Sequence, residues 1–213
     1  MTTTATDARF WDRIAPRYAR KPVPDEQAYR MTLERVRAHL ARTDRVLEIG
    51  CGTGTTALKL APFAGQITAR DVSGEMISIA KEKARAQRFD NVHFAQGTLD
   101  DPLLEAESFD RVMAFNLIHL LVDVPAAICR VFELVKPGGL FLSKTPCIGD
   151  VGILTRGLIP VLRAFGRAPF VNYVKKDSLQ VDIINGGFEI IETGLYPAKS
   201  HSLFIVGRKA LGS

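Results

Sequence analysis

Residues 46–54 read Val46-Leu47-Glu48-Ile49-Gly50-Cys51-Gly52-Thr53-Gly54 and carry the clearest indication of the fold. A short apolar run stops at three glycines in alternate positions, and a helical pattern with apolar positions at Ala57 and Leu58 follows. Because glycine has no side chain, the backbone of such a loop approaches a ligand closely, and the next helix presents free N–H groups. The stretch therefore predicts a strand, a ligand-binding loop and a helix at the carboxyl edge of an α/β sheet.

Outward from this loop, short β-branched runs alternate with helical patterns as far as the C-terminus. Strands that alternate with helices across short loops indicate βαβ units and a parallel sheet. We therefore expect an α/β fold: a Rossmann-like, doubly wound, mostly parallel seven-stranded sheet with helices on both faces and a lid insert after the fifth strand. The expected strands are 45–49, 66–71, 92–95, 109–115, 140–143, 187–191 and 203–206, and the expected later helices are 73–88, 125–135 and 178–185.

The pattern divides the chain into two regions and an insert. Residues 1–43 are expected to form an N-terminal helical arm or cap, residues 44–213 the main domain, and residues 146–176 a substrate-covering insert within it. The insert is amphipathic at helical spacing, and its proline predicts two short helical pieces or a kink. Such a segment caps a cleft, which is the favoured interpretation, or lies on an anionic membrane surface. Its apolar positions are Leu154, Leu158, Val161, Leu162 and Phe165, its basic positions are Arg156, Arg163 and Arg167, and its proline is Pro160.

Composition excludes several classes of protein. The 213 residues are 46% hydrophobic and 24% charged, which is typical of a globular chain and not of a disordered one. No stretch approaches eighteen uncharged apolar residues, and the first residues lack the apolar core of a signal peptide, so a cytoplasmic protein is expected. The net charge of +5 is weak for a nucleic-acid coat protein. Three cysteines and four histidines show no metal-ligand spacing, so no metal site is expected.

The spacing of the loop bears on its ligand. A dinucleotide loop needs Gly-x-Gly-x-x-Gly, whereas here the third glycine comes one residue early and Thr55 follows it. Asp71, twenty-one residues after Gly50 at the end of the second expected strand, suits a ribose diol in either class of ligand. The spacing favours an adenosine ligand that is not a dinucleotide.

These residues resemble a known family. Residues 46–54 look like the first motif of class I S-adenosylmethionine-dependent methyltransferases, and residues 10–18 are similar to the opening of the quinone-biosynthesis type of small-molecule methyltransferase. The resemblance implies S-adenosylmethionine as cofactor and S-adenosylhomocysteine as product. It continues through Asp71-Val72-Ser73 with Met76, Gly97-Thr98-Leu99 and Val135-Lys136-Pro137-Gly138-Gly139.

The resemblance also implies roles for individual residues. The glycine loop would wrap the methionine part and the ribose, with Glu48 organising the amino group and Asp71 accepting from both ribose hydroxyls. Met76 and Leu99 would sandwich the adenine, and Tyr18 would close over the carboxylate end. The family often has Asp where this chain has Thr98, so Asp100 is an alternative partner for the adenine amine. The full expected cofactor set is Tyr18, Glu48, Gly50, Cys51, Gly52, Gly54, Asp71, Val72, Met76, Thr98, Leu99 and Asn116.

Methyl transfer from a sulfonium needs alignment more than covalent catalysis. A base is needed only if the nucleophile must lose a proton, and His119, just past the fourth expected strand, is the candidate. The alternative is a histidine that satisfies a helix terminus. Asn116-Leu117-Ile118-His119 lacks the Asn/Asp-Pro-Pro-Tyr/Phe pattern of nucleobase amino methylation, so a nucleic-acid substrate is not favoured.

The sequence therefore predicts an S-adenosylmethionine-dependent methyltransferase that acts by direct in-line displacement. Its expected partner is a small, apolar or amphiphilic molecule such as a lipid or quinone precursor, with peripheral membrane contact as a further hypothesis. Methylation of oxygen, nitrogen or carbon is equally compatible with the scaffold. The alternatives are an RNA or protein methyltransferase, favoured by the net charge of +5, and a non-catalytic S-adenosylmethionine-binding protein.

Overall fold

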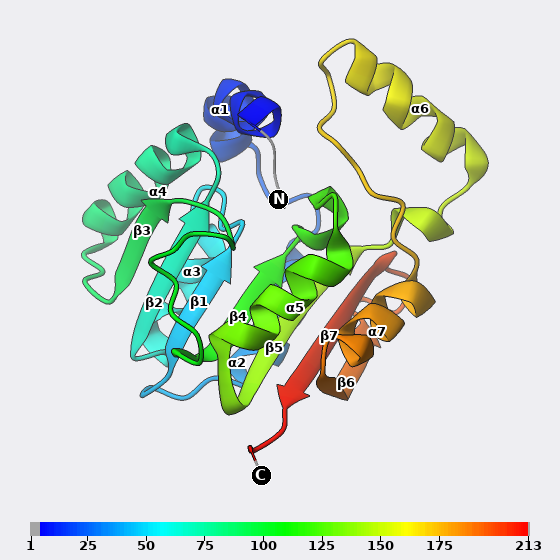
Figure 1. The fold of residues 1–213 in the computed structure, drawn as a ribbon. Coiled ribbons are helices and arrows are strands. Elements are labelled where there is room, and N and C mark those ends of the chain that lie inside the picture. The colour runs from blue at the N-terminus through cyan, green and yellow to red at the C-terminus, as the bar shows by residue number, and fades with distance from the viewer. Residues whose placement is uncertain (1–4, 213) are drawn as a thin grey trace.

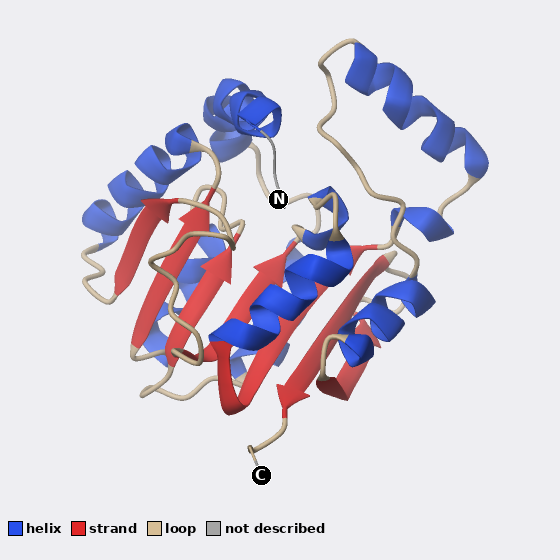
Figure 2. Cartoon of the chain, viewed as in Figure 1, coloured by secondary structure: helices blue, strands red, loops and turns tan. Residues whose placement is uncertain are grey.

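The computed structural model describes residues 5–212, without the side chains of residues 5–7 and 153–156. Seven strands form one sheet in the order β3-β2-β1-β4-β5-β7-β6 (Figures 1 and 2). The first five run parallel, and β7 is antiparallel to both of its neighbours. The predicted doubly wound, mostly parallel seven-stranded sheet is confirmed. The strands are β1 Arg45–Ile49, β2 Gln66–Asp71, β3 Val92–Gln96, β4 Phe109–Phe115, β5 Val135–Pro146, β6 Phe188–Leu195 and β7 Ser202–Lys209.

Helices cover both faces of the sheet and bury two apolar layers. One layer contains buried side chains of α2, α3 and α4, and the other those of α5 and α7. The longer helices are α1 Ala5–Arg20, α2 Glu26–Arg37, α3 Thr55–Leu60, α4 Gly74–Gln87, α5 Val124–Leu134, α6 Ile153–Ala164 and α7 Lys176–Asn185.

The strands β1 and β4 lie inside the sheet, and each has apolar side chains buried on both faces. Val46 and Leu47 are buried in opposite layers, as expected for a strand with helices on either side. Asp123 and Ser73 cap α5 and α4 by accepting the backbone N–H groups of Ala126 and Met76. These caps fix where each helix begins, directly after the loops at the carboxyl edge of the sheet.

The N-terminal region is joined closely to the sheet through α2. Val36 is fully buried in the same layer as α3 and α4. Arg35 donates two hydrogen bonds to Glu192 of β6, at 2.8 and 2.7 Å, and His39 Nε2 lies 2.8 Å from the same carboxylate. The boundary at residue 43 between an arm and a main domain stays a prediction.

The insert departs from its expected form. Residues 153–164 form one helix, α6, with Pro160 inside it, so of the two predicted forms the two separate pieces are wrong and the kink stays a prediction. Proline removes one helical hydrogen bond but does not by itself end a helix. The exposed fractions of Leu158 and Phe165 are 55% and 75%, so these apolar side chains face solvent. The predicted roles of Leu154 and Arg156 lie outside the described side chains.

The edge of the sheet at which the parallel strands end is covered by helices. Both α1 and α6 lie beyond the carboxyl ends of the parallel strands, where Figure 1 shows them on either side of the upper edge. Over the described residues, none of the helices has the length and apolar character that crossing a bilayer demands.

Candidate active site

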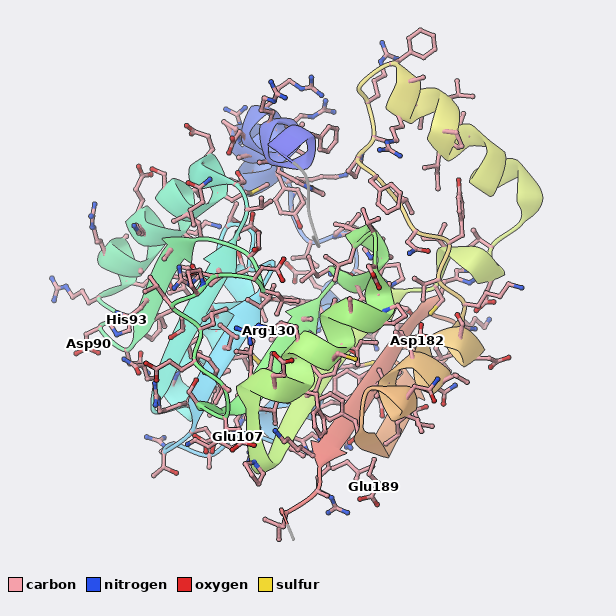
Figure 3. The ribbon with its side chains drawn as sticks, viewed as in Figure 1. Asp90, His93, Glu107, Arg130, Asp182 and Glu189 are labelled. Atoms are coloured by element: carbon pink, nitrogen blue, oxygen red, sulfur yellow. The ribbon has the colours of Figure 1, made fainter. Side chains whose placement is uncertain are left out.

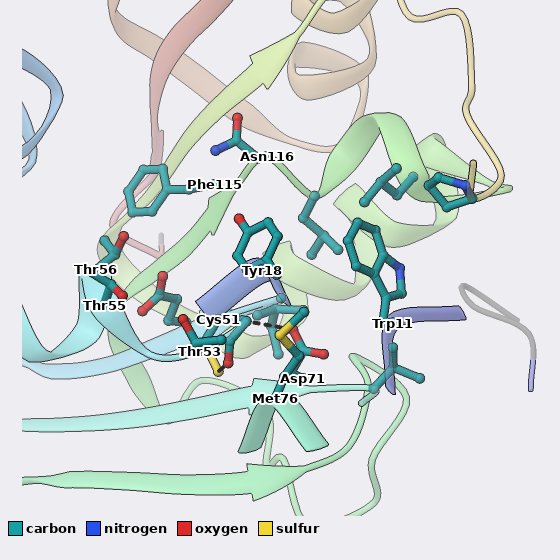
Figure 4. Close-up of a pocket in the computed structure, with 18 of the residues that line it drawn as sticks. Trp11, Tyr18, Cys51, Thr53, Thr55, Thr56, Asp71, Met76, Phe115 and Asn116 are labelled. Atoms are coloured by element: carbon teal, nitrogen blue, oxygen red, sulfur yellow. Dashed lines mark hydrogen bonds between the residues drawn. The ribbon is translucent and has the colours of Figure 1, made fainter. Parts of the chain in front are cut away.

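A cavity of about 410 Å³ opens at the carboxyl ends of β1, β2 and β4, in the position where α/β sheets bind ligands. Residues that are far apart in sequence meet there, because the ends of parallel strands share one edge of the sheet. Figure 4 shows Tyr18, Asp71, Phe115 and Asn116 around this one space. Of the predicted cofactor set, the lining includes Tyr18, Glu48, Gly50, Cys51, Gly52, Asp71, Val72, Met76, Thr98, Leu99 and Asn116.

The glycine loop forms the floor of the cavity. Gly52 has a φ of +52°, and a Cβ added there would meet nothing within 4 Å, so its missing side chain leaves room on the cavity side. Gly54 has a φ of +74°, but an added Cβ would lie 2.6 Å from the Phe94 ring. Gly54 does not line the cavity, so its glycine is needed for packing between the loop and β3.

Lys83 of α4 holds the glycine loop in place through hydrogen bonds. Its Nζ donates hydrogen bonds to Thr53 O at 3.1 Å, Thr53 Oγ1 at 2.9 Å and Thr55 Oγ1 at 3.2 Å. Burial lowers the pKa of this ammonium. The loop is therefore held in shape before any ligand binds.

Asp71 ends β2 and is held from two sides. Its Oδ1 accepts Ser73 N–H at 2.9 Å, and its Oδ2 accepts Gly52 N–H at 2.8 Å. Burial raises the pKa of this carboxyl, and the two backbone hydrogen bonds act in the opposite direction. Each carboxylate oxygen has a second lone pair, so the side chain can still accept from a hydroxyl in the cavity.

Glu48 is the most deeply buried acid of the site. It lies on β1 and is 2% exposed, and its Oε2 has no hydrogen-bond partner among the described residues. Burial, and secondly the charge of Asp71, raise the pKa of Glu48 to about 8, while the Ala57 backbone N–H lowers it. A buried carboxyl oxygen without a donor is costly, so this position fits a ligand that brings a cationic N–H group.

The loop after β3 forms the opposite wall. Thr98 lines the cavity and Asp100 does not, so the structure brings Thr98, and not its predicted alternative, to the ligand space. Arg70 and Asp101 hold this loop with an ion pair of 2.8 Å. Met76 and Leu99, both almost fully buried, also line the cavity.

The N-terminal helix α1 closes the cavity from above. Tyr18 lines it and is 50% exposed, and burial and secondly the charge of Asp71 raise the pKa of its hydroxyl. Trp11 also lines the cavity and packs edge-on against Tyr18, with ring centroids 6.5 Å apart. The sequence reasoning missed Trp11, although its seven-residue spacing from Tyr18 places both on one helical face.

The segment after β4 brings Asn116 but not His119 to the cavity wall. Asn116 lines the cavity at a φ of +54°, a left-handed conformation uncommon outside glycine. His119 does not line it, although Leu120 and Leu121 do. Its Nδ1 is buried without a partner among the described residues, and burial lowers the pKa of the imidazole to about 4.

Beyond the glycine loop, the cavity is mainly apolar and aromatic. Tyr29 of α2, whose hydroxyl lies 3.1 Å from Thr56 Oγ1, forms one side. Phe115 and the insert residues Pro169 and Phe170 form the others. The sequence reasoning did not single out these residues, because no motif connects them. Within the described part of the chain, no three His, Cys, Asp or Glu residues are grouped to hold a metal.

The cavity can be compared with known proteins. A family model described as a methyltransferase domain matches residues 46–139, which contain the glycine loop, Asp71, Met76, Leu99 and Asn116. Curated relatives that span most of the chain are also methyltransferases. The chain is a class I S-adenosylmethionine-dependent methyltransferase.

Three comparisons illustrate the relationship. The ubiquinone biosynthesis O-methyltransferase of Xanthomonas axonopodis pv. citri (strain 306) is 29% identical over 187 residues, which cover 85% of this methyltransferase and 76% of the relative. The uncharacterized methyltransferase YcgJ of Bacillus subtilis (strain 168) is 35% identical over 98 residues, 46% of this chain and 39% of that protein. The crystal structure of YcgJ has a TM-score of 0.70 at 19% identity and covers 86% of this chain and 100% of its own, which shows the same fold.

The cofactor of this methyltransferase is S-adenosylmethionine, and the residues present fit it. The molecule carries an ammonium group and a ribose diol. The cavity offers the unpaired Glu48 Oε2, the free lone pairs of Asp71 and the open space at Gly52. The donors of the cofactor would therefore meet acceptors of the cavity, its ammonium group at Glu48 and its ribose hydroxyls at Asp71.

Proposed function

We propose that this methyltransferase methylates an oxygen of a small aromatic, apolar or amphiphilic molecule, such as a catechol-type quinone precursor. The observation that carries the proposal is the apolar and aromatic wall beyond the glycine loop, formed by Phe115, Leu120, Leu121, Pro169 and Phe170. Such a wall favours an apolar ring over a charged polymer. The ubiquinone biosynthesis O-methyltransferases among the relatives support oxygen as the acceptor atom.

We assign the cofactor contacts as the sequence predicted them. Glu48 accepts from the ammonium group, directly or through water, and Asp71 accepts from the ribose hydroxyls. Met76 and Leu99 hold the adenine between them, and Tyr18 covers the carboxylate end. S-adenosylmethionine, when bound, supplies a methyl group on a sulfonium that is open to in-line displacement. The burial of Glu48 and the two backbone bonds of Asp71 support these assignments, because both carboxyls are fixed in place.

The part of the cavity that would hold the substrate has two tasks. It aligns the substrate oxygen with the methyl group, and it provides a group that takes up the substrate's proton. Holding an oxygen in line with a reactive methyl group contributes several kcal/mol to catalysis. We retain His119 as the proposed base, because its ring is neutral at pH 7 and its buried Nδ1 has no described partner. Burial holds its pKa at about 4, so the ring is a weak proton acceptor unless a bound acceptor that develops negative charge raises this pKa. The ring is not part of the wall, so the role requires its contact with the acceptor to form on binding.

Peripheral contact with an anionic membrane is a second part of the proposal. Residues 151–176 contain five basic residues and no acidic one. Leu158 of α6 and Phe165, the residue directly after this helix, are exposed to solvent. Basic charge beside exposed apolar side chains is the combination that binds an anionic lipid surface. Flotation with anionic liposomes at low salt tests this part, and protein that stays at the bottom of the gradient refutes it.

A defined acceptor tests the proposed function directly. Purified protein is incubated with S-adenosylmethionine and 4-methylcatechol, and mass spectrometry measures the monomethyl ether. The control is Asp71→Ala, which removes the ribose contact. Ether formed by the wild type and not by the control supports the proposal. If RNA or protein supplied in parallel assays is methylated instead, the result supports an RNA or protein methyltransferase. If the cofactor binds and no acceptor is methylated, the result supports a non-catalytic S-adenosylmethionine-binding protein.

A further inference from the structure

Asn116 interrupts an otherwise apolar wall of the cavity. The segment after β4 contributes five residues to the cavity lining, and four of them are apolar: Phe115, Leu117, Leu120 and Leu121. The fifth, Asn116, is exposed in the cavity, and its carboxamide makes no hydrogen bond within the described residues. A free amide offers both donors and an acceptor, so this position can hold a polar group of a ligand.

The backbone at Asn116 adopts a conformation that glycine adopts more easily. Its φ is +54°, and its N–H donates to Lys144 O of β5 at 2.8 Å. Lys144 is held in turn, because its Nζ donates to Thr32 Oγ1 at 2.6 Å and to Tyr196 O at 2.9 Å. Strained residues gather at functional sites, where the surrounding structure holds them in place. Glycine would fit this backbone without strain but would remove the amide, so the amide is what asparagine adds here.

Asn116 stands between the glycine loop and the apolar wall. The next residue, Leu117, packs against the loop, since a Cβ added at Gly50 would lie 2.8 Å from Leu117 Cδ1. Figure 4 shows Asn116 beside Phe115 and on the other side of the cavity from Asp71. The amide therefore lies away from the carboxylate assigned to the ribose and next to the wall proposed for the acceptor.

We propose that Asn116 is a specificity residue that holds the hydroxyl next to the reacting hydroxyl of the acceptor. The inference rests on the proposed function and adds to it the residue that recognises a second hydroxyl on the neighbouring ring carbon. The carbonyl oxygen of the amide accepts a hydrogen bond from that hydroxyl. The amide is neutral, so it orients the ring and leaves the uptake of the reacting proton to another group.

A change in the substrate is paired with a change in the residue to test this role. The kcat/KM is measured with 4-methylcatechol and with 4-methylphenol, which lacks the neighbouring hydroxyl. Asn116→Gly removes the amide and fits the positive φ. Relative to wild type, its preference for the catechol is expected to fall about fivefold to tenfold, the equivalent of one hydrogen bond. The different acidities of the two phenols affect both proteins equally and cancel in this comparison.

Arg88→Gly is the matched control. Arg88 ends α4 at a φ of +58° and does not line the cavity, so glycine relieves a similar backbone conformation without removing a cavity group. Both variants are expected to keep or raise the melting temperature, and only Asn116→Gly is expected to change the preference. The Kd of S-adenosylhomocysteine should stay within about twofold of wild type in both. The preference is a ratio, so a smaller folded fraction does not alter it.

The outcomes separate the role of Asn116 from the proposed function. A preference that Asn116→Gly leaves unchanged, or a tenfold loss of S-adenosylhomocysteine affinity in this variant, would overturn the inference and leave the proposed reaction standing. If wild type methylates neither phenol, the proposed reaction fails. The Kd values of the two phenols for the complex with S-adenosylhomocysteine then decide on Asn116 by the same comparison. Failure of both phenols to bind that complex would overturn both.

Discussion

The Asp12 carboxylate accepts a hydrogen bond from the Ser73 hydroxyl at 2.7 Å, and so joins α1 to the first turn of α4. The same oxygen also accepts Glu75 N–H at 3.2 Å. Ser73 is the N-cap of α4, and its own backbone N–H donates to Asp71. One short chain of hydrogen bonds thus connects the helix that covers the cavity with the carboxylate at its floor.

Asp12→Ala is expected to loosen α1 over the cavity and to weaken S-adenosylhomocysteine binding about tenfold, because a charge-assisted hydrogen bond is lost. Ser73 still caps α4 through Met76 N–H, so the fold should persist. Calorimetric titration measures the effect. The matched control is Asp123→Ala, which removes the N-cap of α5 and costs about 1 kcal/mol of stability without touching the cavity. Equal losses of affinity in both variants would contradict a specific role for α1.

Glu48 gives the cofactor-free protein a distinctive pH dependence. Its folded-state pKa of about 8 lies above its ordinary value of 4.5, so the folded state holds the proton more firmly in this range. The free energy of unfolding is therefore expected to fall as pH rises from about 5 to about 8, by at most about 1.4 kcal/mol per pH unit. Urea unfolding across this range should show the decline in wild type and a flatter curve in Glu48→Gln.

The matched control for this measurement is Glu82→Gln, which changes an exposed carboxyl on α4 and should leave the decline intact. Binding provides a second readout. An ammonium beside Glu48 favours its ionised form, so S-adenosylhomocysteine binding at neutral pH should release more protons from wild type than from Glu48→Gln. Titrations in two buffers of different ionisation enthalpy measure that difference. Identical proton release would show that Glu48 does not meet the amino group.

His119→Gln tests the proposed base. If the imidazole takes the acceptor's proton, kcat for 4-methylcatechol should fall by about 100-fold while the Kd of S-adenosylhomocysteine stays unchanged. The control His93→Gln changes an exposed histidine on β3, away from the cavity (Figure 3), and should have no effect. A loss of kcat below about threefold in His119→Gln would leave alignment alone as the source of catalysis.

The contacts of the Glu192 carboxylate with Arg35 and His39, here called the Glu192 cluster, should stabilise the protein at neutral pH. This stabilisation should be lost in acid. The hydrogen bonds from Arg35 hold the pKa of Glu192 at about 2, below its ordinary value of 4.5. Its contribution is therefore present above about pH 4.5 and is lost as pH falls toward about 2. Glu192→Gln is expected to cost about 1–2 kcal/mol near pH 7 and much less near pH 3, as measured by urea unfolding.

The exposed pair of Arg208 and Glu189 provides the comparison for that cluster. Glu189 lies on the same strand, at the end of the sheet away from α1 and α6 (Figure 3), and its side chain is 65% exposed. Glu189→Gln should therefore cost less than about 0.5 kcal/mol at either pH. If both variants lose the same stability, the anchoring of α2 through Glu192 is not specific.

The parts of the fold and site that could be predicted are those with local signals. The run 46–54 shows its own strand and turn, and Asp71 follows from its distance to Gly50 along a single βαβ unit. Tyr29 and Phe170 could not be placed, because elements distant in sequence bring them to the cavity, whereas Trp11 could have been found from its helical spacing to Tyr18. The direction of His119 was also beyond sequence reasoning: its position after β4 is local, but the orientation of its ring depends on packing in the folded chain. Pro160 does not divide α6 into two helices, because a helix can continue past a proline with one hydrogen bond missing.

The most direct test uses S-adenosylmethionine labelled on its transferable methyl group. Purified protein is incubated with it and a deproteinised cell extract, and the products are divided between organic and aqueous phases. If the acceptor is apolar, label enters the organic phase with wild type, and none above background enters it with Asp71→Ala. Label that depends on Asp71 but stays in the aqueous phase would contradict an apolar acceptor.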